Sequence, residues 1–319
     1  MGARQKKRNE TCSTITGVRK SACVAGIVVW VFGLGLCAGA EAKTSEHLRV
    51  AASIAPIADM IRHVGGDAVL VTTVVPAGAN PHTFELNPSV LQELEGSRIF
   101  FVVGYHLDHW LGRLAEGLPN AESVVSGTSD LLVVDGEIDP HYWLSVERAK
   151  GIARNVANTL QRVDPGRSEQ YERNLENYLE LLEQTDREIK SLLSELPTRN
   201  IVTAHDGWRY FAASYGLQVI GTVYPANDTE PTPKYLAGLA GVIKANRIQV
   251  LFSDVQMPQA ITRSFADDLG LEHWELDPFG GVEGRRTYHD LMVYNARAIR
   301  EALQNKTAAF QETGKGDAP

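Results

Sequence analysis

Cysteine is scarce in this chain, and the positions of its few cysteines exclude whole classes of site. The 319 residues include only three cysteines, Cys12, Cys23 and Cys37, all within the first 42 positions. The chain beyond them can therefore form neither a disulfide nor a metal site built on thiolates. A metal site there has to use imidazole nitrogens and carboxylate oxygens.

Basic charge and catalytic motifs are lacking as well. The formal net charge is -8, and an acidic chain repels phosphate backbones, so we expect no nucleic-acid partner. The sequence contains no His-Glu-x-x-His, no Gly-x-Ser-x-Gly and no carboxylate cluster for two metals, which removes the common hydrolase motifs. Hydrophobic residues at 44% and charged residues at 22% are typical of a globular protein.

Residues 1–42 have the layout of a secretory signal peptide. Six basic residues occur up to Lys20, an apolar run follows at 22–36, and small residues come next at 38–40. The apolar run is shorter than the roughly 20 residues of a membrane-spanning helix. We therefore predict export to the periplasm, with cleavage after Ala40 or Ala42.

Two properties of the exported chain depend on this leader. The leader carries six basic and two acidic residues, so its removal changes the net charge from -8 to -12. Such an acidic surface suits a cation as cargo. Lipid attachment at Cys37 is the alternative to cleavage, but Leu36 before the cysteine fits the lipoprotein pattern poorly.

Short apolar runs alternate with longer amphipathic ones through the rest of the chain. The short runs, rich in β-branched residues, are Leu48–Ala51, Val69–Val75, Ile99–Val103, Ile201–Ala204, Val219–Val223, Gln249–Phe252 and Trp274–Leu276. Helical spacing occurs at 57–64, 107–118, 207–215, 233–244, 258–268 and 287–304. This alternation predicts an α/β fold with mostly parallel sheets, and the length favours two lobes.

One long amphipathic helix is predicted between the two halves, from Ser168 to Leu193. Its apolar residues recur at steps of three and four: Tyr171, Leu175, Tyr178, Leu182, Ile189 and Leu192. That is the period of a helix with one buried face, and about 26 residues give a length of about 39 Å. We therefore expect an N-terminal lobe at 43–166, a linking helix at 167–196 and a C-terminal lobe at 197–319.

Four side chains that could bind a metal stand in predicted loops. His82 comes after the run at 69–75, His205 and Asp277 directly follow their runs, and His141 stands in Asp139-Pro140-His141. Open α/β sheets place ligand groups just past the carboxyl ends of their strands. Three imidazoles and one carboxylate would make a closed tetrahedral site for zinc or a neighbouring metal.

A closed site of this kind binds without catalysing. Each half of the chain supplies two ligands, so both lobes would be metal-binding, and the ion would favour their closed arrangement. A catalytic zinc normally keeps one position open for water, so we predict that the protein is not an enzyme. The main rival is an exported zinc hydrolase in which Glu85 or Asp206 acts as general base.

Five segments of the chain together resemble one known family. They are Asn80–Glu85 with Pro88; Gly104–Leu111; Asp139–Leu144; Thr203–Asp206 with Tyr210, Phe211, Tyr215 and Gly216; and Asp277-Pro278 with Thr287-Tyr288, Leu291-Met292 and Asn295. They resemble the metal-specific solute-binding proteins of bacterial ABC importers for zinc and manganese. The resemblance implies two Rossmann-like lobes joined by a long rigid helix, a metal ion carried between them, and delivery by a monomer to a membrane permease. An adhesin role, attributed to some relatives, has no feature of its own in the sequence.

His205 bears on which metal is carried. In the family this ligand is histidine in many zinc binders and often glutamate in manganese binders, and imidazoles favour zinc because manganese prefers oxygen. We therefore predict Zn2+ as cargo, with Mn2+ as the alternative. Many zinc members also have a His-rich loop, whereas residues 112–137 contain no histidine, so the choice stays open.

The remaining histidines fall into two groups. His106 and His109 stand where the family usually has a glutamate, and three residues apart they would share one helical face. A second, weaker metal site is one interpretation; surface histidines are the other, which we favour because no third ligand accompanies them. The others are interpreted as structural or solvent-exposed, namely His47, His63, His273 and His289.

Overall fold

The computed structural model describes residues 47–127, 130–134, 136–225 and 230–313, with side chains up to residue 304. The predicted signal peptide, its cleavage site and Cys37 lie outside this range. In the part of the chain that the structure describes, no helix has the length and apolar character needed to cross a membrane.

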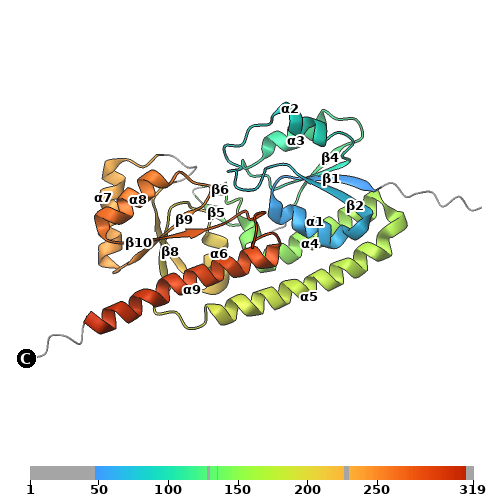
Figure 1. Ribbon diagram of the computed structural model, residues 1–319. Helices are drawn as coiled ribbons and strands as arrows, with labels where there is room; N and C mark the ends of the chain where they lie inside the picture. The colour runs from blue at the N-terminus through green and yellow to red at the C-terminus, as the bar shows by residue number, and fades with distance from the viewer. Residues whose placement is uncertain (1–46, 128–129, 135, 226–229, 314–319) are drawn as a thin grey trace, which may run out of the picture. The chain divides into compact units, whose positions relative to one another are not determined.

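The first half of the chain forms a parallel sheet with the strand order β2-β1-β3-β4 (Figure 1). The strands are β1 (Leu48–Ala52), β2 (Val69–Thr73), β3 (Ile99–Val102) and β4 (Glu122–Val125). Successive side chains of a strand point to opposite faces, so Ile99 and Phe101 join the core under α1 (Ala55–Gly65), while Phe100 and Val102 pack with α3 (His109–Glu116). A short α2 (Pro88–Glu93) completes this half. Both faces of the sheet are thereby covered, which explains its apolar strands.

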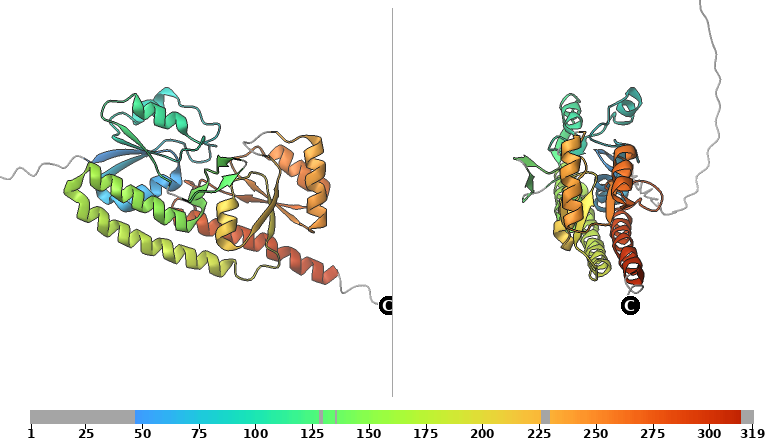
Figure 2. Two further views of the ribbon diagram at one scale, coloured as in Figure 1. Left: turned by 180° about the vertical axis from the view of Figure 1, so that it is seen from behind. Right: turned by 90° about the vertical axis from the view of Figure 1, so that its left-hand side faces the viewer.

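The second half repeats the plan with the strand order β10-β9-β7-β8, again parallel. Its strands are β7 (Asn200–Thr203), β8 (Gln218–Thr222), β9 (Val250–Asp254) and β10 (Glu272–Leu276). Its helices are α6 (Arg209–Tyr215), α7 (Pro233–Ala245) and α8 (Gln259–Leu269), and Figure 2 shows them on either side of the sheet. The predicted α/β class with parallel sheets is confirmed.

Three long helices join the halves: α4 (Val146–Val163), α5 (Ser168–Leu192) and α9 (Tyr288–Thr313). Helix α5 is the predicted linking helix, and it packs against α1, α4 and α9. The sequence analysis missed α4 and α2, as well as strand β4 and the small hairpin β5 (Val133–Val134) with β6 (Glu137–Ile138). The proposed lobe boundaries stay a prediction.

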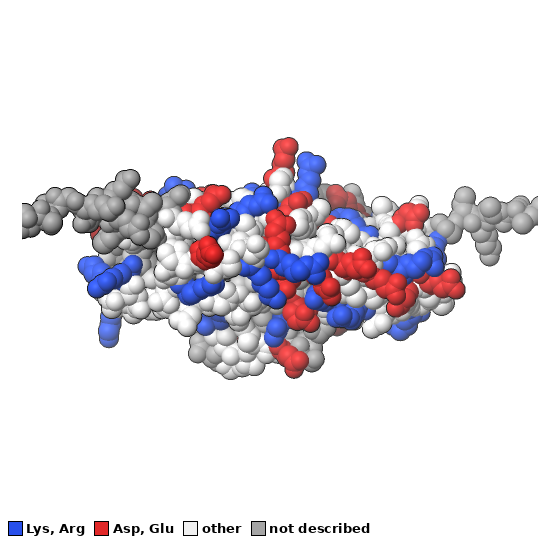
Figure 3. Space-filling model, turned by 90° about the horizontal axis from the view of Figure 1, so that it is seen from below, with Lys and Arg blue, Asp and Glu red and all other residues white. Residues whose placement is uncertain are grey.

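Charged side chains of both signs are interspersed on the face shown in Figure 3. Ion pairs join Asp186 of α5 to Lys190 and Glu188 of α5 to Arg297 of α9. The acidic side chains Asp186 and Glu188 of α5 are half-buried, whereas Glu172, Glu176, Glu180 and Glu183 are exposed, so most of this helix face is solvated. The buried core lies beneath it, and one hydrophobic cluster contains residues of both sheets, including Phe101 and Phe252.

Candidate metal site

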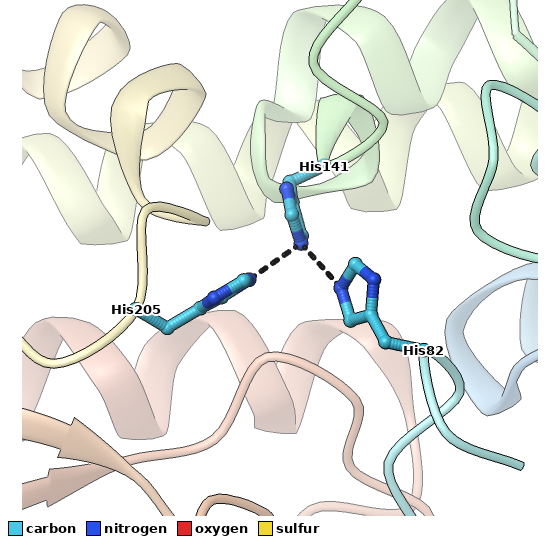
Figure 4. A group of neighbouring side chains, drawn as sticks. All are labelled: His82, His141 and His205. Carbon is cyan, nitrogen blue, oxygen red and sulfur yellow. Dashed lines mark hydrogen bonds between the residues drawn. The ribbon is translucent and has the colours of Figure 1, made fainter. Parts of the chain in front are cut away.

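Three of the four predicted ligands meet at one point. The Nε2 atom of His141 lies 3.3 Å from Nε2 of His82 and 3.0 Å from Nε2 of His205 (Figure 4). The three potential ligand atoms all lie within 4.8 Å of one another. Zinc bound at about 2.0–2.1 Å by nitrogens at tetrahedral angles separates them by about 3.4 Å. Two of the three spacings in the triad are therefore close to what one small ion requires.

Each histidine reaches this point from a loop after a strand or a hairpin. His82 follows β2, His205 follows β7, and His141 follows the β5–β6 hairpin. His141 and His205 are buried, whereas His82 keeps partial exposure. The site is thus enclosed on the side of His141 and His205 and is accessible from the side of His82.

Two Asx-Pro turns set His82 and His141 in place. The backbone N–H of His82 donates to Asn80 Oδ1 at 2.9 Å, and that of His141 donates to Asp139 Oδ1 at 2.9 Å. In both turns the proline between the Asn or Asp and the histidine fixes one backbone angle. The motif Asn/Asp-Pro-His is thus a local device that orients a histidine, and the sequence shows it twice.

Asp139 has a second function that the sequence analysis missed. Its Oδ1 also lies 2.8 Å from Nδ1 of His141, and both side chains are 4% exposed. With Nδ1–H donating to this carboxylate, the Nε2 lone pair of His141 is left to face the other histidines, the arrangement that metal-bound histidines commonly have. Burial lowers the pKa of His141 below its usual value of 6.5, as does the neighbouring His205, while Asp139 opposes the shift. The imidazole is therefore kept neutral, as a ligand must be.

Gly207 leaves the space that the triad needs. A Cβ atom at this position would lie 2.8 Å from Cδ2 of His205 and 3.1 Å from Cδ2 of His141. The first contact is shorter than real Cβ atoms show and the second is tight, so a side chain here would displace the ring of His205. Only the glycine itself marks this requirement in the sequence.

Asp277, the fourth predicted ligand, does not belong to the three-histidine group. It follows β10, is 1% exposed, and its Oδ1 accepts hydrogen bonds from Gln256 Nε2 at 2.7 Å, Phe279 N at 3.0 Å and Gly280 N at 2.9 Å. Its Oδ2 lies 3.1 Å from Nε of Arg285. Asp277 as a ligand stays a prediction, and the sequence analysis had not singled out Gln256 or Arg285.

The segment after Asp277 is nevertheless joined to the triad. Trp143 Nε1 donates a hydrogen bond to the carbonyl oxygen of Pro278 at 2.8 Å. The centre of the Trp143 ring lies 5.3 Å from the centre of the His141 ring, and the two rings are tilted relative to each other. One tryptophan therefore lies between the loop of His141 and the segment that carries Asp277.

The other histidines make no comparable group. His106 is exposed, with Nε2 3.7 Å from Oε2 of Glu137, and His109 begins α3 on the surface. Among the described residues, only the triad brings three metal-binding side chains together. Each of the four histidines interpreted as structural or exposed has a contact with another residue. The pairs are His47 with Asp67, His63 with Asp59, His273 with Ser253, and His289 with Thr185.

Comparison with known proteins identifies the family. Residues 50–302 match the family model described as "Zinc-uptake complex component A periplasmic". The chain is 27% identical over 297 residues to the manganese-binding lipoprotein MntA of Halalkalibacterium halodurans, covering 89% of this chain and 99% of that protein.

One further relative is named for zinc, and one solved structure has a similar fold. The zinc-binding lipoprotein AdcA of Streptococcus pneumoniae is 23% identical over 294 residues, which are 85% of this chain and 59% of that longer protein. A crystal structure of ZnuA superimposes with a TM-score of 0.74 at 28% identity, covering 81% of this chain and 99% of that chain. Because the family model spans most of the sequence, the protein belongs to the family of the periplasmic component A of zinc-uptake complexes, the metal-binding members of ABC importers.

Proposed function

We propose that this chain captures Zn2+ outside the cytoplasm and delivers it to the membrane permease of an ABC importer. The observation that carries the proposal is the convergence of three imidazole nitrogens from His82, His141 and His205. As a substrate-binding protein of an ABC importer the chain is not an enzyme, as predicted from the sequence. The bases considered for a hydrolase also lack a suitable setting, since Glu85 is exposed and Asp206 pairs with Arg209 at 2.7 Å.

The donor atoms favour zinc over manganese. Imidazole nitrogen suits zinc, whereas manganese prefers carboxylate, carbonyl and water oxygens. Manganese is the second candidate, because the relative MntA is named for that metal.

A competition titration tests the choice of metal. Protein purified after export and stripped with a chelator is titrated with Zn2+ and with Mn2+ against a chromophoric chelator. We expect zinc to bind at least about a hundredfold more tightly, in line with the order of affinities for nitrogen ligands. Equal or tighter binding of manganese would overturn the choice.

Two histidine variants test the site itself. His82→Ala removes one ligand and should weaken zinc binding strongly, whereas His106→Ala changes an exposed histidine with a single distant carboxylate partner and should leave it unchanged. Equal losses in both would place the site elsewhere.

The cellular location follows from export. We propose a periplasmic monomer that meets its permease at the membrane surface. The relatives MntA and AdcA are named lipoproteins, so mass spectrometry of the mature N-terminal peptide is the deciding measurement: an unmodified start after Ala40 or Ala42 supports a soluble protein, and a lipid on Cys37 supports an anchored one.

A further inference from the structure

Asp277 holds a buried negative charge whose counter-charge comes from a single arginine. The carboxylate is 1% exposed, and Arg285, whose side chain is 19% exposed, places Nε 3.1 Å from Oδ2. A carboxylate this deeply buried requires a cation or a dense set of hydrogen bonds to stay charged. The two oxygens of Asp277 meet that requirement in different ways.

Oδ1 is held firmly and Oδ2 is not. Oδ1 accepts three hydrogen bonds, from Gln256 and from the backbone N–H groups of Phe279 and Gly280. Oδ2 accepts no hydrogen bond from any described residue, and neither does Nε of Arg285 find an acceptor among them despite the short distance. The contact is therefore an attraction between charges without hydrogen-bond geometry, and Oδ2 is the oxygen that another cation could take over.

Arg285 has an alternative partner in place. Its guanidinium lies over the ring of Tyr294, 4.4 Å from the ring centre, which is a favourable cation–π contact. If the contact with Asp277 breaks, the guanidinium of Arg285 therefore still has a favourable contact with Tyr294. Arg285 stands in a loop in which Gly280, Gly281 and Gly284 all have positive φ.

The same segment is close to the metal triad. Trp143 connects Pro278, the residue after Asp277, to the ring of His141. A zinc ion on three imidazoles has one tetrahedral position left, and a carboxylate oxygen is a suitable ligand for it.

We propose that Arg285 is the substitute cation of the metal-free site: it neutralises Asp277 until zinc arrives, and capture exchanges Arg285 for the metal at Oδ2. This rests on the proposed function and adds a positioning residue that sets affinity and release. Because Arg285 competes with the cargo, it weakens binding, and because it takes back the carboxylate, it favours release to the permease.

The test compares Arg285→Gln with Arg285→Lys in the full-length protein, with Zn2+ as the probe. Removing the charge should tighten zinc binding by about tenfold or more and slow transfer to a chelator, because the buried carboxylate then lacks a cation until the metal binds. The metal-free protein should melt at a lower temperature, and the zinc-loaded protein should change less. Arg285→Lys, which keeps the charge, should bind like the wild type.

Two controls decide whether Arg285 acts through Asp277. In an Asp277→Asn background, where the imidazoles still bind, Arg285→Gln should no longer change affinity. Arg263→Gln removes an arginine that pairs with Glu275 at 3.0 Å in the same half and should change neither affinity nor release.

Several results would overturn the inference. They are unchanged or weaker binding in Arg285→Gln, an equal gain in the Asp277→Asn background, or a gain in Arg285→Lys as large as in Arg285→Gln. A merely structural arginine would lower both melting temperatures alike and would not tighten zinc binding. Failure of the wild type to bind zinc would instead refute the proposed function.

Discussion

At the scale of single residues, the site depends on how its histidines are held neutral and oriented. His141 is at the centre of the three-histidine group, because its Nε2 contacts both other imidazoles. Its orientation comes from Asp139, which binds both its backbone N–H and its Nδ1. The function of His141 therefore depends on a residue two positions before it.

Asp139→Asn should weaken zinc binding without unfolding the protein. The amide can replace one acceptor but carries no charge, and loss of such a partner typically lowers metal affinity by about 10–100-fold. Asp164→Asn is the matched control, because Asp164 pairs with Arg167 at 2.6 Å in the turn that joins α4 and α5. A competition titration that shows the same zinc affinity in Asp139→Asn and the wild type would contradict this role.

The stability of the metal-free protein should fall in mild acid. Burial lowers the pKa of folded His141 below 6.5, so the unfolded chain takes up the proton first. Stability from this group is complete above pH of about 6.5, and falls below it by up to about 1.4 kcal/mol per pH unit until the folded pKa is reached. Urea unfolding of metal-free wild type and His141→Gln at several pH values isolates the effect: a constant difference between them between pH of about 7 and 5 would rule it out.

At the scale of elements, the turn between β7 and α6 brings His205 close to His141. This turn contains Gly207, whose missing side chain lets the two imidazoles approach. The approach of two rings from opposite halves thus depends on one small residue in a connecting turn.

Gly207→Ala should weaken zinc binding at little cost to the fold. An added methyl group 2.8 Å from the His205 ring has to displace it, and a shift of an ångström is enough to spoil a metal site, while overpacking costs typically 1–3 kcal/mol. Gly238→Ala is the control, since a Cβ there meets nothing within 4 Å. Zinc affinity and thermal melting of both variants provide the test, and unchanged affinity in Gly207→Ala would refute the crowding argument.

At the scale of the whole molecule, a metal ion would hold together two halves that already share a core. One hydrophobic cluster includes Phe101 of the first sheet and Phe252 of the second. Asp59 of α1 also accepts a hydrogen bond at 2.9 Å from the backbone N–H of Tyr288, where α9 begins. Extensive lobe motion would break these contacts, so we expect capture to act mainly on loops around the site.

Removing the metal should lower the melting temperature. A ligand at a thousand times its Kd stabilises the folded state by about 4 kcal/mol, which corresponds to roughly 8–16 °C for a protein of this size. Differential scanning calorimetry with excess zinc and with EDTA measures the shift. His141→Ala should show no shift with zinc, and an equal shift in this variant would mean that the ion stabilises the protein from another site.

The sequence alone determined the class of fold and the residue types that could bind a metal. Alternating runs specify strands and helices because backbone periodicity is local, and α5 was predictable because its apolar residues keep the helical period over 25 residues. Helix α4 has a similar period, with Val146, Ala149, Ile152, Ala153 and Val156 buried, so it was missed although the signal was present. The histidines were predictable because each stands beside a strand end or in a proline turn.

Only the tertiary structure decided which of these side chains lie together and which do not. Whether a side chain that follows a strand of one sheet meets a side chain that follows a strand of the other depends on the distance between the two sheets. No local sequence pattern encodes that distance. The position of Asp277 depends on Arg285, Gln256 and Trp143, drawn from three other segments of the chain. The types of candidate ligand follow from the sequence, because the residue type fixes the donor atom. The point where these side chains meet follows from packing, because it is a property of the assembled core.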